Sequence, residues 1–481
     1  MKSNRRDFLK TTGLAGITLA GTSMIPGCST TNTGDEKSNL DYIRVQAKQN
    51  QTQRFNMNDY AAPKIDTVRI GIIGLGARGA DTVALLPLID GIDIKVVCDL
   101  VPEKAEAAKK KLEQSGFHPD TYSGQEDSWK QLCDRNDIDL VYIITPWAWH
   151  VPMAVYAMEH GKHVAVEVPA AETIEGCWQL VTTSERTRKH CMMLENDCYD
   201  FFGLMTLNMA RQGFFGEIIH GEGAYIHDRM KRFFDKEQTT WRLQENINRN
   251  GNLYPTHGLG PICQIMNINR GDKMDYLVST SSNDFMMGNM ADKLAETDDY
   301  WKPFAHTKYR GNMNVSIIRT KGGRTIMMQH DVSSPRVYSN ILLFSGTKAS
   351  AQKYPLPPRI SVATGHEWIS DAEYKILEEK YSPEIVKKLG EEAKMLGAAG
   401  HDGIDLLLNW RLIDCLRNGL SLDMDVYDAA LWSSIIPLSQ WSVANRSNSI
   451  DIPDFTCGAW KKNQPKMDIN LLRGGTTKII N

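Results

Sequence analysis

Residues 63–195 alternate between short apolar runs and longer stretches with helical periodicity. The runs have the length and apolar character of buried β-strands, and they stand at 68–73, 92–98, 138–145, 163–168 and 191–194. Because strands that alternate with helices build parallel sheets, we expect an α/β fold here, a doubly wound Rossmann domain. Its ligands should bind at the carboxyl ends of the strands.

The first strand leads into the sequence GLGARG, a GxGxxG turn formed by Gly74, Gly76 and Gly79. The first glycine makes the tight turn, the second lets the backbone approach a pyrophosphate, and the third lets the helix pack closely. The next strand ends in Asp99, whose carboxylate can hold both ribose hydroxyls and repels a 2′-phosphate. We therefore predict NAD as the cofactor rather than NADP. Alternatively, Asp99 only caps the helix that follows Pro102.

The pattern changes in residues 196–455, where we expect an α+β domain with a large, mostly antiparallel open sheet. Residues 314–331 read as a hairpin with a Gly-Gly turn, and 338–354 add strand. One sheet face should cover the first domain and the other remain free, so we expect a homo-oligomer through this face. Residues 403–419 and 425–444 read as amphipathic helices that return to the sheet, 370–397 as a surface insert, and 456–481 as an extended tail.

The N-terminal segment predicts export. Paired Arg5 and Arg6 precede Phe8, Leu9 and Lys10 and a glycine-rich apolar run, a pattern typical of a twin-arginine signal over residues 1–28. The run is too short for a good membrane span. Cys28 follows a lipoprotein-like box and is a candidate lipid anchor, and residues 29–62 have the composition of a polar tether or arm. We expect a periplasmic or lipid-anchored protein; a disordered basic N-terminus is the alternative.

Composition narrows the function classes. The chain has 481 residues, which favours two domains, and its net charge of −3 without a basic block argues against nucleic-acid binding. Its nine cysteines include no CxxC pair, so we expect no zinc site and mostly buried thiols. The chemistry must therefore come from the predicted cofactor and from titratable side chains.

The motifs GARG, WAWH, EVPAA, LEND, YPTHGLGPI and SPRVYS resemble glycoside hydrolase family 109, NAD-dependent α-N-acetylgalactosaminidases within the glucose–fructose oxidoreductase and inositol dehydrogenase superfamily. That superfamily usually carries Glu-Lys-Pro where this chain has Glu167-Val168-Pro169. An ordinary alcohol dehydrogenase of the superfamily is therefore not expected.

The resemblance also implies site residues. Besides the glycine turn, it places NAD contacts at Ala77, Arg78, Asp99, Trp147, Ala148, Trp149, His150, Glu167, Val168 and Asn196. It places contacts with a sugar at Tyr225, Arg242, Tyr254, Pro255, Thr256, His257 and Tyr338. Among these we expect His257 and Tyr225 to act as acid/base residues, with pKa values drawn towards neutrality, and Arg242 and Tyr338 to grip the sugar.

Export and a dinucleotide site together favour a closed redox cycle, since little free NAD is available outside the cytoplasm. A glycosidase can oxidise the sugar at C3, eliminate the C1 oxygen by loss of the C2 proton, add water and reduce C3 again, without the usual carboxylate pair. The alternatives are a sugar dehydrogenase or oxidoreductase, a lyase or epimerase that uses the same C3 oxidation, and a sugar-binding lipoprotein. At single positions, His257 as a helix cap and Tyr225, Tyr338 and Val168 as packing residues also stay open.

Overall fold

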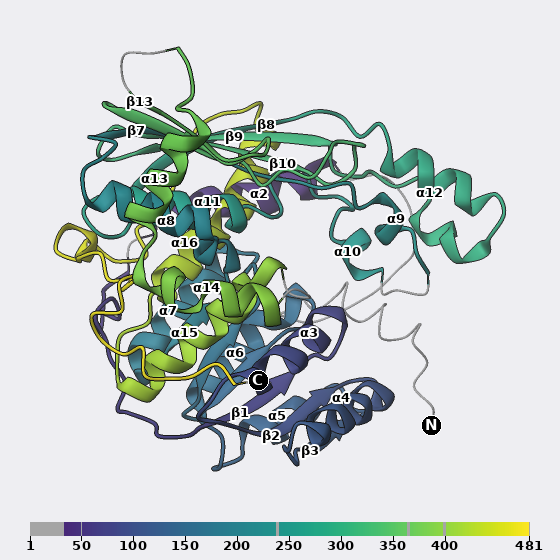
Figure 1. The fold of residues 1–481 in the computed structure, drawn as a ribbon. Helices are drawn as coiled ribbons and strands as arrows, with labels where there is room; N and C mark the ends of the chain where they lie inside the picture. The colour runs from purple at the N-terminus through teal and green to yellow at the C-terminus, as the bar shows by residue number, and fades with distance from the viewer. Residues whose placement is uncertain (1–32, 50, 237–239, 363–365, 398–400, 481) are drawn as a thin grey trace.

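The computed structural model describes residues 33–480, apart from 50, 237–239, 363–365 and 398–400. The predicted twin-arginine signal and Cys28 lie outside these residues. Within them, no helix is long and apolar enough to cross a bilayer. Two sheets with helices packed between and around them make up the molecule (Figure 1).

The first sheet is the predicted Rossmann sheet. Its six strands are all parallel in the order β3-β2-β1-β4-β5-β6. They are β1 (Val68–Ile73), β2 (Ile92–Asp99), β3 (Asp120–Ser123), β4 (Leu140–Ile143), β5 (His163–Val166) and β6 (Cys191–Met193). The helices are α3 (Ala77–Leu85), α4 (Pro102–Gln114), α5 (Ser128–Cys133), α6 (His150–Glu159) and α7 (Ile174–Thr187). Strand order reverses between β1 and β4, and a dinucleotide binds at such a switch point.

The second sheet has eight strands in the order β13-β12-β11-β7-β10-β9-β8-β14, all antiparallel pairs except β7 with β10. The strands are β7 (Ile218–Ile226), β8 (Met274–Ser281), β9 (Met313–Thr320), β10 (Thr325–Asp331), β11 (Leu342–Gly346), β12 (Ala349–Gln352), β13 (Arg359–Val362) and β14 (Ile450–Asp451). The predicted hairpin is confirmed as β9 and β10, with Gly323 at φ +87° in its turn. The predicted α+β domain with an open sheet is therefore confirmed.

Helices α8 (Phe201–Arg211), α11 (Thr256–Ile265) and α16 (Val426–Ala444) cover the face of this sheet that looks towards the first domain (Figure 1). Strand β7 and helix α11 approach so closely that a Cβ on Gly223 would lie 2.6 Å from the carbonyl oxygen of Gly258. Glycine at both positions therefore sets the distance between the end of β7 and the start of α11.

A side lobe projects from the second domain beyond β8, β9 and β10, on the right in Figure 1. It contains α9 (Met230–Phe233), α10 (Trp241–Gln244), α12 (Met287–Ala295) and the 3₁₀ helix η4 (Asp299–Phe304), around its own small core. The predicted surface insert is confirmed as α13 (Asp371–Tyr381) and α14 (Glu384–Leu396), which break at Pro383.

Two segments differ from expectation. Residues 29–62 are not a free tether throughout, because α2 (Thr33–Ala47) packs against α16 and α7, and Met57 and Asn58 are buried. The tail is extended as predicted, but it is held against the body: Trp410 donates to the Thr477 carbonyl at 3.0 Å, and Met467 is buried. Apolar residues in both segments are buried and hold them against the body, although the segments are polar in overall composition.

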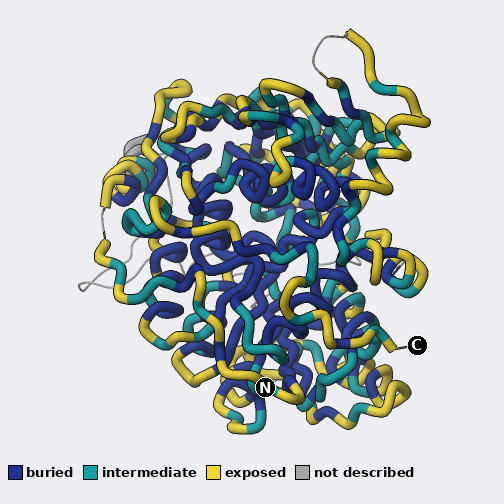
Figure 2. The backbone as a smooth tube through the Cα atoms, turned by 60° about the vertical axis from the view of Figure 1, so that its left-hand side comes forward, coloured by how far each residue is buried: buried dark blue, intermediate teal, exposed yellow. Residues whose placement is uncertain are grey.

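The C-terminal helices α15 (Ile404–Asn418) and α16 are buried nearly all round rather than amphipathic. Helix α15 packs on the first domain instead of returning to the second sheet; Tyr142 on β4 donates to Asn409 at 2.9 Å. One apolar core therefore runs through both domains, and the buried backbone in the middle of Figure 2 follows it. The eight described cysteines are unpaired and mostly buried, as predicted.

Candidate functional site

The glycine turn shapes a space in front of α3. Gly74 has φ +93°, and a Cβ there would lie 2.4 Å from the carbonyl oxygen of Ile144. A Cβ on Gly79 would lie 2.0 Å from the carbonyl oxygen of Gly74, whereas one on Gly76 would meet nothing within 4 Å. Gly74 and Gly79 therefore form the turn, and Gly76 leaves room at the helix N-terminus that a pyrophosphate fits.

Asp99 ends β2 directly beside this turn. Its carboxylate accepts the amide of Leu75 at 2.7 Å and the amide of Val101 at 2.8 Å. Val101 is the N-cap residue of α4, and this helix has no side-chain cap, so the structure does not support Asp99 as a helix cap. The side chain stays partly exposed next to the turn, where a ribose can reach it.

Arg78 connects the turn to other segments at the same edge of the sheet. Its guanidinium donates to Glu167, which follows β5, at 2.6 Å and to both oxygens of Asp405 at 2.5 and 2.8 Å. The amide of Asn196, which follows β6, donates to Asp405 at 2.8 Å. The Oδ1 atom of Asn196 is buried without a partner among the described residues, so it offers an acceptor to a ligand. These residues fit NAD.

The four residues of the WAWH segment differ in burial and in contacts. Trp147 is buried and stacks on Tyr254 with ring centroids 5.8 Å apart, whereas Ala148 and Trp149 are more exposed. His150 is fully buried; its ring nitrogens lie 2.7 and 2.8 Å from the carbonyl oxygens of Pro169 and Thr145. The imidazole therefore joins two turns, and its nitrogens are not open to a cofactor as the resemblance implied.

Val168 belongs to the apolar core and is buried. Its backbone amide donates to Oε2 of the neighbouring Glu167 at 3.2 Å. The structure therefore supports the packing alternative for this side chain. Glu167, in contrast, faces the Arg78 guanidinium at the edge of the sheet.

The predicted sugar residues come together where β7 ends and α11 begins. The ring centroids of Tyr225 and Tyr254 lie 4.8 Å apart. The His257 ring lies 5.5 Å from that of Tyr225 and 5.0 Å from that of Tyr254. Pro255 precedes the helix, and Thr256 opens it with a buried hydroxyl that lacks a partner among the described residues. Arg229, which the sequence did not single out, donates to the Tyr225 hydroxyl at 3.0 Å.

Arg242 and Tyr338 border this group. The Arg242 guanidinium lies over the rings of Trp241, Trp147 and Tyr254, at 4.4, 5.1 and 5.6 Å from their centroids. Such stacking holds a cation in a fixed place while leaving its N–H groups available. Tyr338 lies in the loop before β11, is 41% exposed and contacts the ring of His227.

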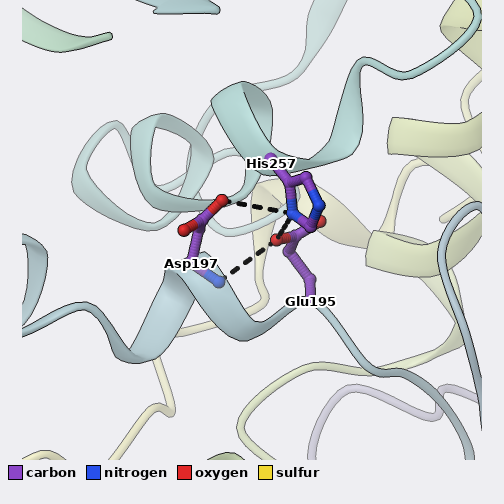
Figure 3. A group of neighbouring side chains, drawn as sticks. All are labelled: Glu195, Asp197 and His257. Atoms are coloured by element: carbon purple, nitrogen blue, oxygen red, sulfur yellow. Dashed lines mark hydrogen bonds and ion pairs between the residues drawn. The ribbon is translucent and has the colours of Figure 1, made fainter. Parts of the chain in front are cut away.

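His257 faces two carboxylates from the LEND motif (Figure 3). Its Nδ1 lies 2.6 Å from Oε1 of Glu195 and 3.1 Å from Oδ2 of Asp197. Burial opposes a charge on the imidazole, but the two carboxylates outweigh it and raise the pKa of His257 to about 10. The expectation of a pKa near neutrality is therefore wrong, because Glu195 and Asp197 stabilise the charged form of the imidazole.

The same group has the spacing of a metal site, since its ligand atoms lie within 4.8 Å of one another. The Nδ1 atom lies at hydrogen-bonding distance from Glu195, and the raised pKa of His257 means that the imidazole donates this bond as a cation. Burial also raises the pKa of Asp197 to about 6, against the influence of His257. We interpret the cluster as a proton-holding group.

Comparison with known proteins agrees with this architecture. Residues 68–195 match the family described as "Oxidoreductase family, NAD-binding Rossmann fold", and residues 199–462 match "Glycosyl hydrolase 109, C-terminal domain". A levoglucosan dehydrogenase in complex with NADH and levoglucosan superposes with a TM-score of 0.62 over 81% of this chain and 100% of that one. At 18% identity, this likeness shows the fold.

Two curated relatives match over most of their length. An "Alpha-N-acetylgalactosaminidase" of Bacteroides fragilis is 50% identical over 84% of this chain and 95% of its own. A "Glycosyl hydrolase family 109 protein" of Shewanella pealeana is 44% identical over 97% of this chain and 99% of its own. Together with the motifs quoted above, these matches establish that the chain belongs to glycosyl hydrolase family 109.

Proposed function

We propose that this protein hydrolyses terminal α-N-acetylgalactosaminides, with NAD as a recycled cofactor. The observation that carries the proposal is the contact between His257 and Glu195. It joins the aromatic sugar site to β6, at the carboxyl edge of the sheet that holds NAD. A sugar on the second domain therefore lies against the edge where the nicotinamide belongs. The named activity of the Bacteroides relative supplies the sugar.

When bound, NAD would supply a hydride acceptor for C3 of the sugar and, as NADH, a hydride donor at the end of the cycle. Tyr225 accepts the C3 hydroxyl proton, with its phenol oxygen held in place by a hydrogen bond from Arg229 at 3.0 Å. His257 starts as an imidazolium, so it acts first as an acid. Its Nδ1 is held by Glu195, which leaves Nε2 to protonate the departing C1 oxygen while the C2 proton passes to solvent. When water adds at C1, Nε2 accepts its proton and C2 takes one back from solvent.

The remaining residues hold the sugar. Arg242, fixed by three aromatic rings, donates hydrogen bonds to hydroxyl or acetamido oxygens. Tyr254 acts as a neutral phenol, since burial raises its pKa. Neutral phenols donate and accept hydrogen bonds and also present apolar ring faces to a pyranose.

The test is release of nitrophenol from p-nitrophenyl α-N-acetylgalactosaminide by purified protein without added NAD. We expect many turnovers and no net NADH. Accumulation of one equivalent of NADH with free sugar and no nitrophenol would instead indicate a dehydrogenase of the same fold. An Arg5→Lys, Arg6→Lys variant offers a control, since it leaves the site unchanged.

We also propose export through the twin-arginine route and association through the outer face of the second sheet. In Figure 1 the helices α8, α11 and α16 all lie on the other face. On the outer face Ile317 is 45% and Tyr276 37% exposed. Light scattering of the purified protein and of an Ile317→Lys variant tests the association. Cell fractionation of the Arg5, Arg6 variant tests export, and mass spectrometry tests lipid on Cys28.

A further inference from the structure

A second buried carboxylate lies at the cofactor edge and has no part in the proton transfers above. Asp405 is the second residue of α15 and is fully buried. Its two oxygens accept from Arg78 at 2.5 and 2.8 Å and from the Asn196 amide at 2.8 Å, and one lies 2.8 Å from Nδ1 of His401. Asp405 therefore bonds to Arg78 in the turn after β1 and to Asn196 in the turn after β6.

Arg78 is the long member of this cluster. It begins in the glycine turn after β1, and its Nε reaches Glu167 after β5, at 2.6 Å. Strand β4 lies between β1 and β5 in the sheet. The arginine side chain therefore crosses the carboxyl end of β4, beside the switch point at which a dinucleotide binds.

The backbone that carries Asp405 is held firmly. His401, Asp402 and Gly403 have φ of 50°, 55° and 92°, all in the left-handed region. A Cβ on Gly403 would lie 2.4 Å from the carbonyl oxygen of Ala393 on α14, so this turn is pressed against that helix. Successive left-handed residues persist only where the surrounding structure holds them, and they cluster at ligand clamps.

We propose that Asp405 is a positioning residue that retains NAD. With two hydrogen bonds it fixes the Arg78 guanidinium at the carboxyl edge where the cofactor binds, and NAD leaves faster once the Arg78–Asp405 pair is broken. A protein that uses one NAD for many turnovers needs such slow release. The inference rests on the NAD cycle of the proposed function but not on the identity of the sugar.

The test compares Asp405→Asn with Asp402→Asn. Asparagine at 405 keeps the shape of the side chain but loses its charge, whereas Asp402 is exposed and Asn tolerates its left-handed backbone. Each protein is loaded with NADH, excess NAD is added, and the loss of NADH fluorescence gives the release rate. We expect at least tenfold faster release for Asp405→Asn and an unchanged rate for Asp402→Asn, both measured well below the melting temperature of the less stable protein, since loss of a buried ion pair lowers stability. Release within twofold of the parent would overturn the proposal.

A double-mutant cycle with Arg78→Lys separates the pair from other effects of Arg78. If Asp405 slows NADH release only through Arg78, the double variant releases NADH no faster than the faster single variant. Multiplying effects would show independent roles and overturn the proposal. Should Asp405→Asn not fold, Asp405→Ser, which also removes the charge, takes its place in the cycle with the same expectations. Absence of hydrolysis in the parent protein would contradict the proposed function only. The NADH release rates would still test the role of Asp405.

Discussion

Nδ1 of His257 lies 2.6 Å from Oε1 of Glu195, and this contact joins the start of α11 to the end of β6. It connects the acid/base residue of one domain to the cofactor edge of the other. Because Oδ2 of Asp197 also lies 3.1 Å from this nitrogen, the two carboxylates keep the imidazole positively charged. The first predictions concern this charge.

Glu195→Gln should lower the pKa of His257, because it removes the carboxylate that raises it most. If His257 acts as an acid, activity falls as pH rises through its pKa. The alkaline limb of kcat/KM should therefore move to lower pH by one unit or more. The pH profile of nitrophenol release measures this shift. Asp197→Asn removes the smaller of the two carboxylate contributions to the pKa of His257, so it should move the limb less. An alkaline limb at the parental position would contradict the assignment.

Stability should depend on the same charge. The folded pKa of His257, about 10, lies above the ordinary value of 6.5. Its contribution to the free energy of unfolding is thus complete below pH 6.5 and is lost as pH rises towards 10. Between pH 7 and 10 the Tm of the parent should fall a few degrees further than that of His257→Gln, measured by calorimetry. Parallel curves for the two proteins would argue against a charged histidine.

Tyr225→Phe should keep NAD content and folding but reduce kcat by about 10²- to 10⁴-fold, the range for loss of a general base. The ring still packs against Tyr254, so only the hydroxyl held by Arg229 is removed. Steady-state kinetics with NAD content measured on the denatured protein tests this. A variant with near-parental kcat would leave Tyr225 as a packing residue.

Gly76→Ala and Gly74→Ala should fail in different ways. A Cβ at Gly76 meets only open space, so the cofactor-free variant should melt within about 2 °C of the parent yet bind NAD at least tenfold more weakly. Gly74→Ala places a Cβ 2.4 Å from Ile144 and strains a φ of +93°, so it should be strongly destabilised. Calorimetry and NADH titration separate the two. Equal NAD affinity in Gly76→Ala and the parent would contradict the placement of the pyrophosphate.

The first domain was predictable because its signals are local. Strand, glycine turn and helix occupy adjacent residues, and apolar periodicity marks each strand. The burial of α15 and α16 was not predictable, since a helix that packs between two domains shows no single polar face to indicate its neighbours.

The site divides in the same way. Residues within motifs, such as Tyr254 and His257, do lie together, as the resemblance implied. Glu195 and Asp197 flank Asn196 at the end of a predicted strand, so two carboxylates at the sheet edge were a usable signal that was missed. Asp405 offered no comparable signal, because its contact with Arg78 joins segments far apart in sequence.

Hydrolysis of the glycoside in D₂O tests the central claim most directly. Elimination removes the C2 proton to solvent and water addition restores one, while the hydride at C3 leaves and returns on the same cofactor. Mass spectrometry and proton NMR of the released N-acetylgalactosamine should show one deuterium at C2 and hydrogen at C3. A product with hydrogen retained at C2 would show that the glycosidic bond breaks without oxidation of the sugar, and would contradict the account.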